Sequence, residues 1–96
     1  MGIMMVMNYF VYVLKCADGT FYTGYTTDLK RREAEHNGKG GKAAKAAGAR
    51  YTRRRRPVKI IYYEKLASRS EALKREAAIK RLSRQEKEKL TGVDRF

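Results

Sequence analysis

The chain has 96 residues, enough for one small domain with a modest hydrophobic core. Its 23 lysines and arginines against 10 aspartates and glutamates give a formal net charge of +13 at pH 7. Such a charge predicts a polyanionic partner, nucleic acid before an anionic membrane surface. The single cysteine excludes an internal disulfide, and with the single histidine it leaves too few ligands for a zinc site.

The first seven residues, MGIMMVM, are apolar but far too short to span a bilayer, and no cleavage site follows them. We therefore expect a cytoplasmic protein without a membrane partner. We expect one domain over residues 1–96, in which residues 1–7 are loosely ordered and residues 38–56 form a flexible basic loop.

Two segments near the N-terminus predict a β-hairpin. Residues 9–15 (YFVYVLK) and 21–26 (FYTGYT) are rich in aromatic and β-branched residues, as strands are. Residues 17–19 (ADG) supply turn chemistry between them. The segment is unusually rich in tyrosine. A phenol packs its ring and also offers a hydroxyl, so these tyrosines fit aromatic packing and chemistry equally well.

The length of the turn decides which tyrosines share a face. A two-residue loop at Asp18-Gly19 would place Tyr12 and Tyr22 on opposite faces. A three-residue loop that also includes residue 17 would set Tyr12 opposite Gly24 and put both phenols on one face. We favour the three-residue loop. Gly24 would then leave room beside the Tyr12 ring for a ligand to approach the backbone.

A helix is predicted directly after the hairpin. Asp28 can cap its start, and the chain leaves the helix by Gly38. Arg32 and His36 are four residues apart and so lie on one helical face. Glu33 marks a side that we expect to face solvent.

Positive charge is concentrated next to the hairpin. Residues 30–59 hold twelve lysines and arginines against two glutamates, and residues 53–56 are four consecutive arginines. A solvated charged surface would explain such a run. Its position beside a tyrosine-rich sheet favours contact with phosphates, which would make binding strongly salt-dependent.

The C-terminal half predicts one strand and two helices. Residues 58–63 (VKIIYY) read as the third strand. Two Ser-x-x-Glu capping boxes open helices over residues 68–82 and 83–90, the second ended at Gly92. The order β-β-α-β-α-α predicts an α+β fold, a small three-stranded antiparallel sheet flanked by helices.

One carboxylate stands out on the helix of residues 68–82. Glu76 falls on the same face as Ala72, Leu73 and Ile79. An ionised carboxylate on an apolar face is costly unless it is paired or binds a metal. An ion pair with an arginine is one explanation. A ligand for a divalent cation is the other, because Mg²⁺ often uses only one or two protein carboxylates.

Taken in order, these features resemble the GIY-YIG nuclease family, most closely its small stand-alone bacterial members, from residue 9 to about residue 90. The elements that carry the resemblance are the motifs Val11-Tyr12-Val13 and Tyr22-Thr23-Gly24, then Arg32, His36, an N-x-G-K loop and the helix with Glu76. Two valines replace the glycine and isoleucine that name the first motif, and no match to the family's final asparagine follows the last helix.

The resemblance implies a DNA endonuclease that hydrolyses phosphodiester bonds with one Mg²⁺ or Mn²⁺ ion, with structure-selective roles in repair or recombination. It implies that Glu76 binds the metal and that Arg32 neutralises charge on the phosphoryl oxygens. Tyr22 would orient or deprotonate the attacking water with support from Tyr12, and His36 would relay the proton or hold Tyr22 in place.

The resemblance also implies a set of substrate contacts along the DNA backbone: Gly24, Asn37, Lys39, Arg53, Arg54, Arg55 and Arg56. Because the chain has no room for a second domain, a targeting protein is an expected partner. Two other functions stay open. One is a catalytically idle nucleic-acid-binding module on the same fold, and the other is a structural protein of an RNA assembly.

Overall fold

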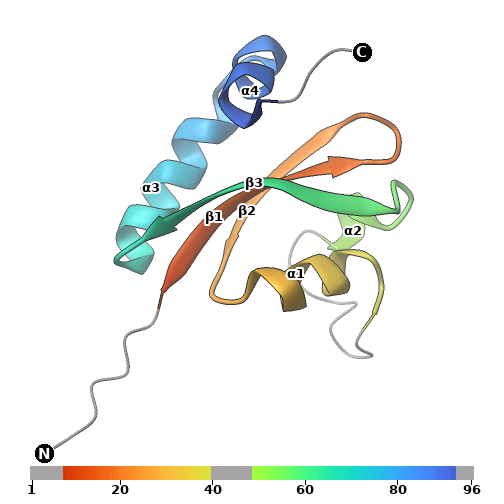
Figure 1. Ribbon diagram of the computed structural model, residues 1–96, viewed down its shortest axis with the longest axis horizontal. Coiled ribbons are helices and arrows are strands. Elements are labelled where there is room, and N and C mark those ends of the chain that lie inside the picture. The colour runs from red at the N-terminus through yellow and green to blue at the C-terminus, as the bar shows by residue number, and fades with distance from the viewer. Residues whose placement is uncertain (1–7, 40–48, 93–96) are drawn as a thin grey trace, which may run out of the picture.

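The computed structural model describes residues 8–39 and 49–92. In chain order they form β1 (Tyr9–Cys16), β2 (Phe21–Thr26), α1 (Leu29–His36), α2 (Ala49–Thr52), β3 (Val58–Leu66), α3 (Arg69–Lys80) and α4 (Arg84–Thr91) (Figure 1). This confirms the predicted α+β fold and its order, with the short helix α2 added in the expected loop. The expectations for residues 1–7 and 40–48 lie outside the described residues. None of the described helices is long and apolar enough to cross a membrane.

The hairpin of β1 and β2 has the favoured three-residue loop. Gly19 closes it at φ +84°, and its N–H donates to the Cys16 carbonyl at 2.9 Å. Tyr12 lies opposite Gly24 in the register, and Tyr22 stands two residues before Gly24 on the same strand. Both phenols therefore point to one face of the sheet.

The strand order is β2-β1-β3, so β1 is central and β3 is an edge. All pairs are antiparallel. β3 extends to Leu66, beyond the predicted end at Tyr63, because the start of β1 at Tyr9 still pairs with Leu66. A register shift after Val13 leaves Tyr63 directly opposite Tyr12.

Helix α1 begins and ends where the sequence predicted. The Asp28 side chain accepts from the Arg31 N–H at 3.0 Å, and Gly38 takes φ +79° just beyond the helix. The expectation that Glu33 faces solvent is wrong. Its Oε2 accepts from the Ile60 N–H at 2.7 Å, so it satisfies a backbone donor of the edge strand. A helix-surface carboxylate thereby ties α1 to β3.

Helix α3 ends at Lys80, two residues before the predicted end at residue 82. The reason is the next cap: Ser83 takes an extended backbone and forms a complete capping box that opens α4. The first capping box forms only in half. Ser68 accepts from the Glu71 N–H, but the Glu71 carboxylate binds the N–H of residue 67 instead of that of Ser68.

The sheet has a different layer of helices on each face (Figure 1). α3 covers one face, where its apolar side chains pack with those of β1 in a cluster of Val11, Val13, Ala72 and Ile79. α1 and α2 cover the other face, over a cluster of Tyr12, Leu14, Cys16 and Val58. Cys16 is a buried thiol in this second cluster.

A charged cluster fixes α3 to β3. Arg75 donates from Nε and Nη2 to the two carboxylate oxygens of Glu64, at 2.8 and 2.9 Å. The Tyr62 hydroxyl donates to the same carboxylate at 2.5 Å. The bidentate geometry makes this a stronger contact than an ordinary surface ion pair.

Candidate active site

Four buried side chains form a continuous hydrogen-bond chain between β1, α1 and α2. The Arg32 Nε–H donates to the Tyr12 hydroxyl oxygen at 3.1 Å, and that hydroxyl contacts His36 Nε2 at 2.9 Å. His36 Nδ1 contacts the Thr52 hydroxyl oxygen at 3.0 Å. The Thr52 hydroxyl in turn donates to the His36 carbonyl at 3.2 Å.

The donors and acceptors of this chain assign the imidazole tautomer. The Thr52 hydroxyl uses its proton on a carbonyl, so its oxygen accepts from His36 Nδ1–H. Nε2 then carries the lone pair and accepts the Tyr12 O–H. Each hydrogen bond from Arg32 through Tyr12 and His36 to Thr52 therefore has a defined donor and a defined acceptor.

Burial determines the charge state of these groups. The pKa of His36 falls to about 4 because the ring is buried, with a further decrease from the Arg32 and Arg56 cations. Burial raises the pKa of Tyr12 to about 12, against the opposing effect of the Arg32 cation. At neutral pH the imidazole and the phenol are therefore both uncharged, as the assigned tautomer requires.

The glycine of the second motif makes room for Tyr12. A Cβ at Gly24 would stand 2.6 Å from the Tyr12 hydroxyl oxygen. The space that we expected beside Gly24 for a ligand is thus taken up by the Tyr12 ring itself. Contact of Gly24 with substrate stays a prediction.

Tyr22 lies next to the histidine on the same face. Its ring centroid is 5.1 Å from that of His36 and 5.4 Å from that of Tyr51. Burial raises the pKa of Tyr22, the Arg32 cation opposes this, and the Glu76 carboxylate adds to it. Tyr22 is only half-buried, so it is more accessible than Tyr12.

Glu76 approaches this cluster from α3. Its carboxylate contributes to the raised pKa of Tyr12 as well as of Tyr22, so its charge acts on both phenols. Helix α3, which covers the opposite face of the sheet, packs along the edge strand β2 as well as β1. The side chain is 17% exposed and its Oε1 lies 3.6 Å from Lys80 Nζ. The observed ion pair is thus with a lysine of the same helix.

The donor set around Glu76 decides which metal it suits. In the described part of the chain, no group of three or more His, Cys, Asp or Glu side chains is arranged to hold a metal ion. A closed zinc site therefore does not fit these residues. One carboxylate that is partly open to solvent fits Mg²⁺, which keeps several waters and takes further oxygens from a substrate phosphate.

The side chains of the cations predicted to contact substrate differ in their exposure and in their contacts within the protein. Lys39, Arg53 and Arg54 are exposed. Arg55 lies over the Tyr51 ring at 4.1 Å, and Arg56 Nε donates to the His36 carbonyl at 2.7 Å. Arg55 and Arg56 therefore already support the fold around the hydrogen-bond chain, whereas the first three side chains extend into solvent.

Asn37, also predicted to contact substrate, is used inside the protein. Its side-chain oxygen accepts from the Val58 N–H at 2.8 Å, and its amide nitrogen donates to the Val58 carbonyl at 3.0 Å. It pairs with an edge-strand residue as a neighbouring strand would. A contact with DNA stays a prediction.

Sequence reasoning missed Thr52, which orients His36. The hydroxyl lies sixteen residues from the histidine, in a stretch read only as a basic loop. No local pattern marks it, because the pairing depends on where α2 packs against the end of α1. Arg32, Tyr12 and His36, in contrast, come together as expected.

Most of the chain is similar to known proteins. Residues 8–89 match the GIY-YIG catalytic domain. The UPF0213 protein lin0209 of Listeria innocua is 56% identical over 83 residues, which cover 84% of this chain and 82% of that protein. The UPF0213 protein VNG_2274C of Halobacterium salinarum is 54% identical over 80 residues, 83% of this chain and 95% of the relative.

Two solution structures share the fold. The UPF0213 protein BH0048 of Bacillus halodurans is 39% identical with a TM-score of 0.54, over 92% of this chain and 86% of that one. The protein EF2693 of E. faecalis is 49% identical with a TM-score of 0.55, over 85% of this chain and 80% of that one. The chain therefore belongs to the GIY-YIG family, in the UPF0213 group of small proteins that occurs in bacteria and archaea.

Proposed function

We propose that this protein is a metal-dependent endonuclease that hydrolyses phosphodiester bonds in DNA. The observation that carries the proposal is the buried chain of Arg32, Tyr12 and His36, with the charge of Glu76 acting on the same phenol. Buried titratable groups with shifted pKa values and defined partners are typical of catalytic sites. The match to the GIY-YIG catalytic domain supports nuclease chemistry in particular.

Each group of the cluster has a role that its environment supports. Arg32 is always charged, its guanidinium donates to Tyr12 and its charge acts on Tyr22, so it would stabilise negative charge that develops on the phosphoryl oxygens. Tyr22, the more accessible phenol, would orient the attacking water. Tyr12 would take the proton from that water while its own proton passes to His36 Nε2.

Glu76 is the residue that would hold Mg²⁺ or Mn²⁺. When bound, such an ion polarises the scissile phosphate and stabilises the leaving oxygen. Lys80, at 3.6 Å from the carboxylate, would have to move aside, and as an exposed lysine on a flexible stem it can do so at little cost.

The charge distribution suits a DNA substrate. The net charge of +13 would draw a polyanion to the protein, and the exposed Lys39, Arg53 and Arg54 extend from the segments next to His36 and Thr52. We expect these three side chains to contact the backbone phosphates and to make binding weaken as salt rises. We also propose that DNA contacts the other predicted residues, Gly24, Asn37, Arg55 and Arg56, and that a targeting protein is a partner.

The direct test is cleavage of flap, junction and linear DNA with Mg²⁺ or Mn²⁺ by wild type and by Glu76→Gln. Glutamine keeps the shape of the side chain and removes the charge that a cation needs, so cleavage should fall at least a hundredfold. Glu71→Gln is the matched control, because it lies on the same helix and a glutamine oxygen can still accept from the N–H of residue 67.

A folded wild-type protein that cuts none of these substrates, or a Glu76→Gln variant as active as wild type, would refute the proposal. The first result together with salt-sensitive DNA binding would instead indicate a catalytically idle binding module.

A further inference from the structure

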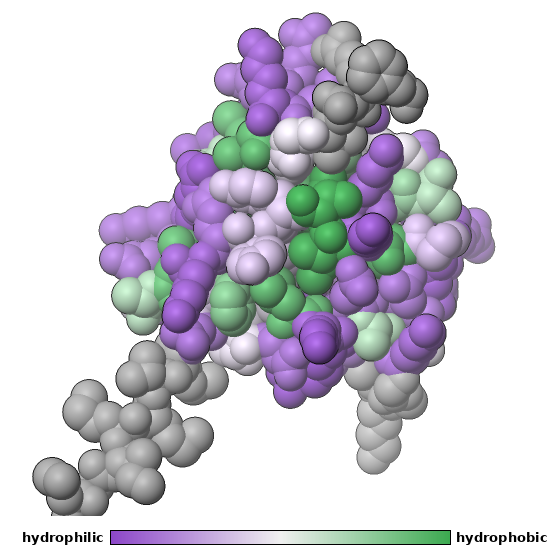
Figure 2. All heavy atoms as spheres, viewed as in Figure 1, coloured by the Kyte–Doolittle hydropathy of each residue, from purple (hydrophilic) through white to green (hydrophobic). Residues whose placement is uncertain are grey.

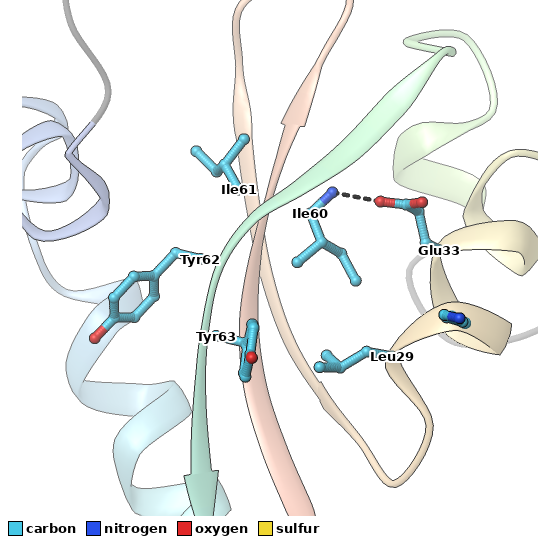
Figure 3. A pocket seen from close by; sticks show the side chains of 7 residues that line it. Leu29, Glu33, Ile60, Ile61, Tyr62 and Tyr63 are labelled. Atoms are coloured by element: carbon cyan, nitrogen blue, oxygen red, sulfur yellow. Dashed lines mark hydrogen bonds between the residues drawn. The ribbon is translucent and has the colours of Figure 1, made fainter.

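A concave site lies on the same face of the sheet as the phenol cluster, by which we mean Tyr12 and Tyr22 with Arg32 and His36. It is a cavity of about 470 Å³ between α1 and β3, lined by Leu29, Lys30 and Glu33 from the helix and by residues 60–63 from the strand (Figure 3). This volume is within the range of small-molecule sites. Figure 2 looks onto the molecule as Figure 1 does and shows hydrophobic side chains gathered in the middle of an otherwise largely hydrophilic face.

An exposed aromatic ring stands at this cavity. Tyr63 is 57% exposed, and with Leu73 it makes up the exposed large hydrophobic side chains of the described residues. The Phe10 ring supports it edge-on, at 6.0 Å between centroids. Leu73 lies on α3, the helix of the opposite face. A flat ring at the mouth of an apolar cavity is a surface on which another flat ring can stack.

The cavity and the phenol cluster share one wall. Arg32 and His36 of α1 contact Tyr12, whereas Glu33 of the same helix contacts β3 and lines the cavity. Tyr63 is the direct cross-strand partner of Tyr12, and the Cβ atoms of such pairs lie about 5 Å apart. A molecule bound to Arg32 through a phosphate would therefore have the cavity next to it.

Charge and shape together indicate what occupies the cavity. The net charge of +13, with exposed Lys30 at the cavity, favours a polyanion. The apolar wall and Tyr63 favour a flat, weakly polar group. An added peptide strand fits less well, because Glu33 and Asn37 already bind backbone groups of β3 at Ile60 and residue 58. A nucleic acid carries both a polyanionic backbone and flat groups.

We propose that this cavity receives an unpaired nucleobase next to the phosphate held at Arg32, with the base stacked on Tyr63. The inference rests on the proposed function and deepens it: the substrate class is nucleic acid with a single-stranded nucleotide beside the cut. An unpaired base can enter without the cost of leaving a duplex stack.

The test measures base stacking without cleavage. Single-stranded oligonucleotides carrying the fluorescent base 2-aminopurine at successive positions are bound to the Glu76→Gln variant, with and without a second substitution at Tyr63. One position should be quenched on binding, and Tyr63→Ala should abolish the quenching. It should also weaken binding about 5- to 150-fold, the range found for one base–aromatic stack. Tyr63→Phe should bind as the parent does.

Three controls make the result specific. Leu73→Ala removes the other exposed apolar side chain and should leave binding unchanged. Fully paired duplex should bind equally with and without Tyr63→Ala. Sedimentation of the free protein should give the same oligomeric state with and without Tyr63→Ala. A difference would assign the cavity to a second copy of the chain and overturn the proposal.

The outcome is separable from that of the proposed function. Equal single-strand binding by Tyr63→Ala and its parent overturns the base site while cleavage by the wild type stands. Quenching that depends on Tyr63 in a protein that cuts no DNA supports the base site and refutes the nuclease.

Discussion

His36 is the one histidine of the chain, so its ionisation can be followed without overlap. We expect its imidazole to stay neutral from pH 8 to pH 5, because burial and two nearby arginines lower its pKa to about 4. An NMR titration of the ring proton and nitrogen shifts measures this directly. The nitrogen shifts should also show the proton on Nδ1, since Thr52 accepts there and Tyr12 donates to Nε2.

The lowered pKa has a consequence for stability. In the unfolded chain the imidazole takes up its proton near pH 6.5, and in the folded protein only near pH 4. Between these values the unfolded state binds more protons, so the free energy of unfolding falls as the solution is acidified. The difference between these two pKa values corresponds to about 3 kcal/mol of unfolding free energy. This amount is lost between pH 6.5 and pH 4, and the histidine causes no further loss below pH 4.

Urea unfolding at pH 7, 6, 5 and 4 measures this loss. The carboxylates whose pKa values are lowered in the folded protein also weaken it in acid, among them Glu64, which Arg75 binds. These contributions are common to wild type and His36→Gln, so the difference between the two profiles isolates the histidine. A wild-type histidine signal that titrates near pH 6.5 would refute the lowered pKa and the stability argument built on it. This measurement needs only the wild type, so it holds even if the variant fails to fold.

Three further substitutions test the supports of the site and the fold. Gly24→Ala puts a methyl group against the Tyr12 hydroxyl; it should cost about 1–3 kcal/mol of unfolding free energy and shift the histidine NMR signal. Thr52→Val leaves the buried Nδ1–H of His36 without its acceptor and should cost about 1–3 kcal/mol in urea unfolding, whereas Thr52→Ser should cost less. Arg75→Met removes a bidentate pair between α3 and β3 and should lower stability by about 1–2 kcal/mol, with little effect on the histidine pKa.

The parts of the structure that were predictable from the sequence are those set by local rules. The period of two along a strand and the three-residue loop fix which phenols share a face, so the common face of Tyr12 and Tyr22 followed from residues 9–26 alone. Capping residues located both ends of α1, and four-residue spacing placed Arg32 and His36 together. These relations need no knowledge of the rest of the fold.

What was not predictable depends on contacts between distant segments. Thr52 reaches His36 only because α2 packs at the end of α1, and Asn37 binds residue 58 only because β3 runs past that point. The expectation for Glu33 was wrong for the same reason: its pattern on the helix is polar, but the edge strand β3 supplies a backbone donor. The partners of these polar helix side chains lie on distant segments, so the local sequence does not reveal them.

The charge state of the buried chain also limits how the proposed reaction can proceed. At neutral pH Tyr12 is protonated and already donates to His36, so its oxygen can accept a proton from water only as its own proton moves to Nε2. Burial keeps the imidazole neutral, with a further effect from the Arg32 and Arg56 cations, and the same lowered pKa makes it a weak proton acceptor.

A phosphate bound at Arg32 changes that balance. Its negative charge offsets the nearby cations, so the pKa of His36 should rise when substrate binds, and proton transfer becomes favourable only in the complex. The same histidine titration, repeated on Glu76→Gln with a bound oligonucleotide, should therefore give a higher pKa than the free protein. A pKa that stays at about 4 in the complex would exclude His36 as the proton acceptor and leave it the role of orienting Tyr12.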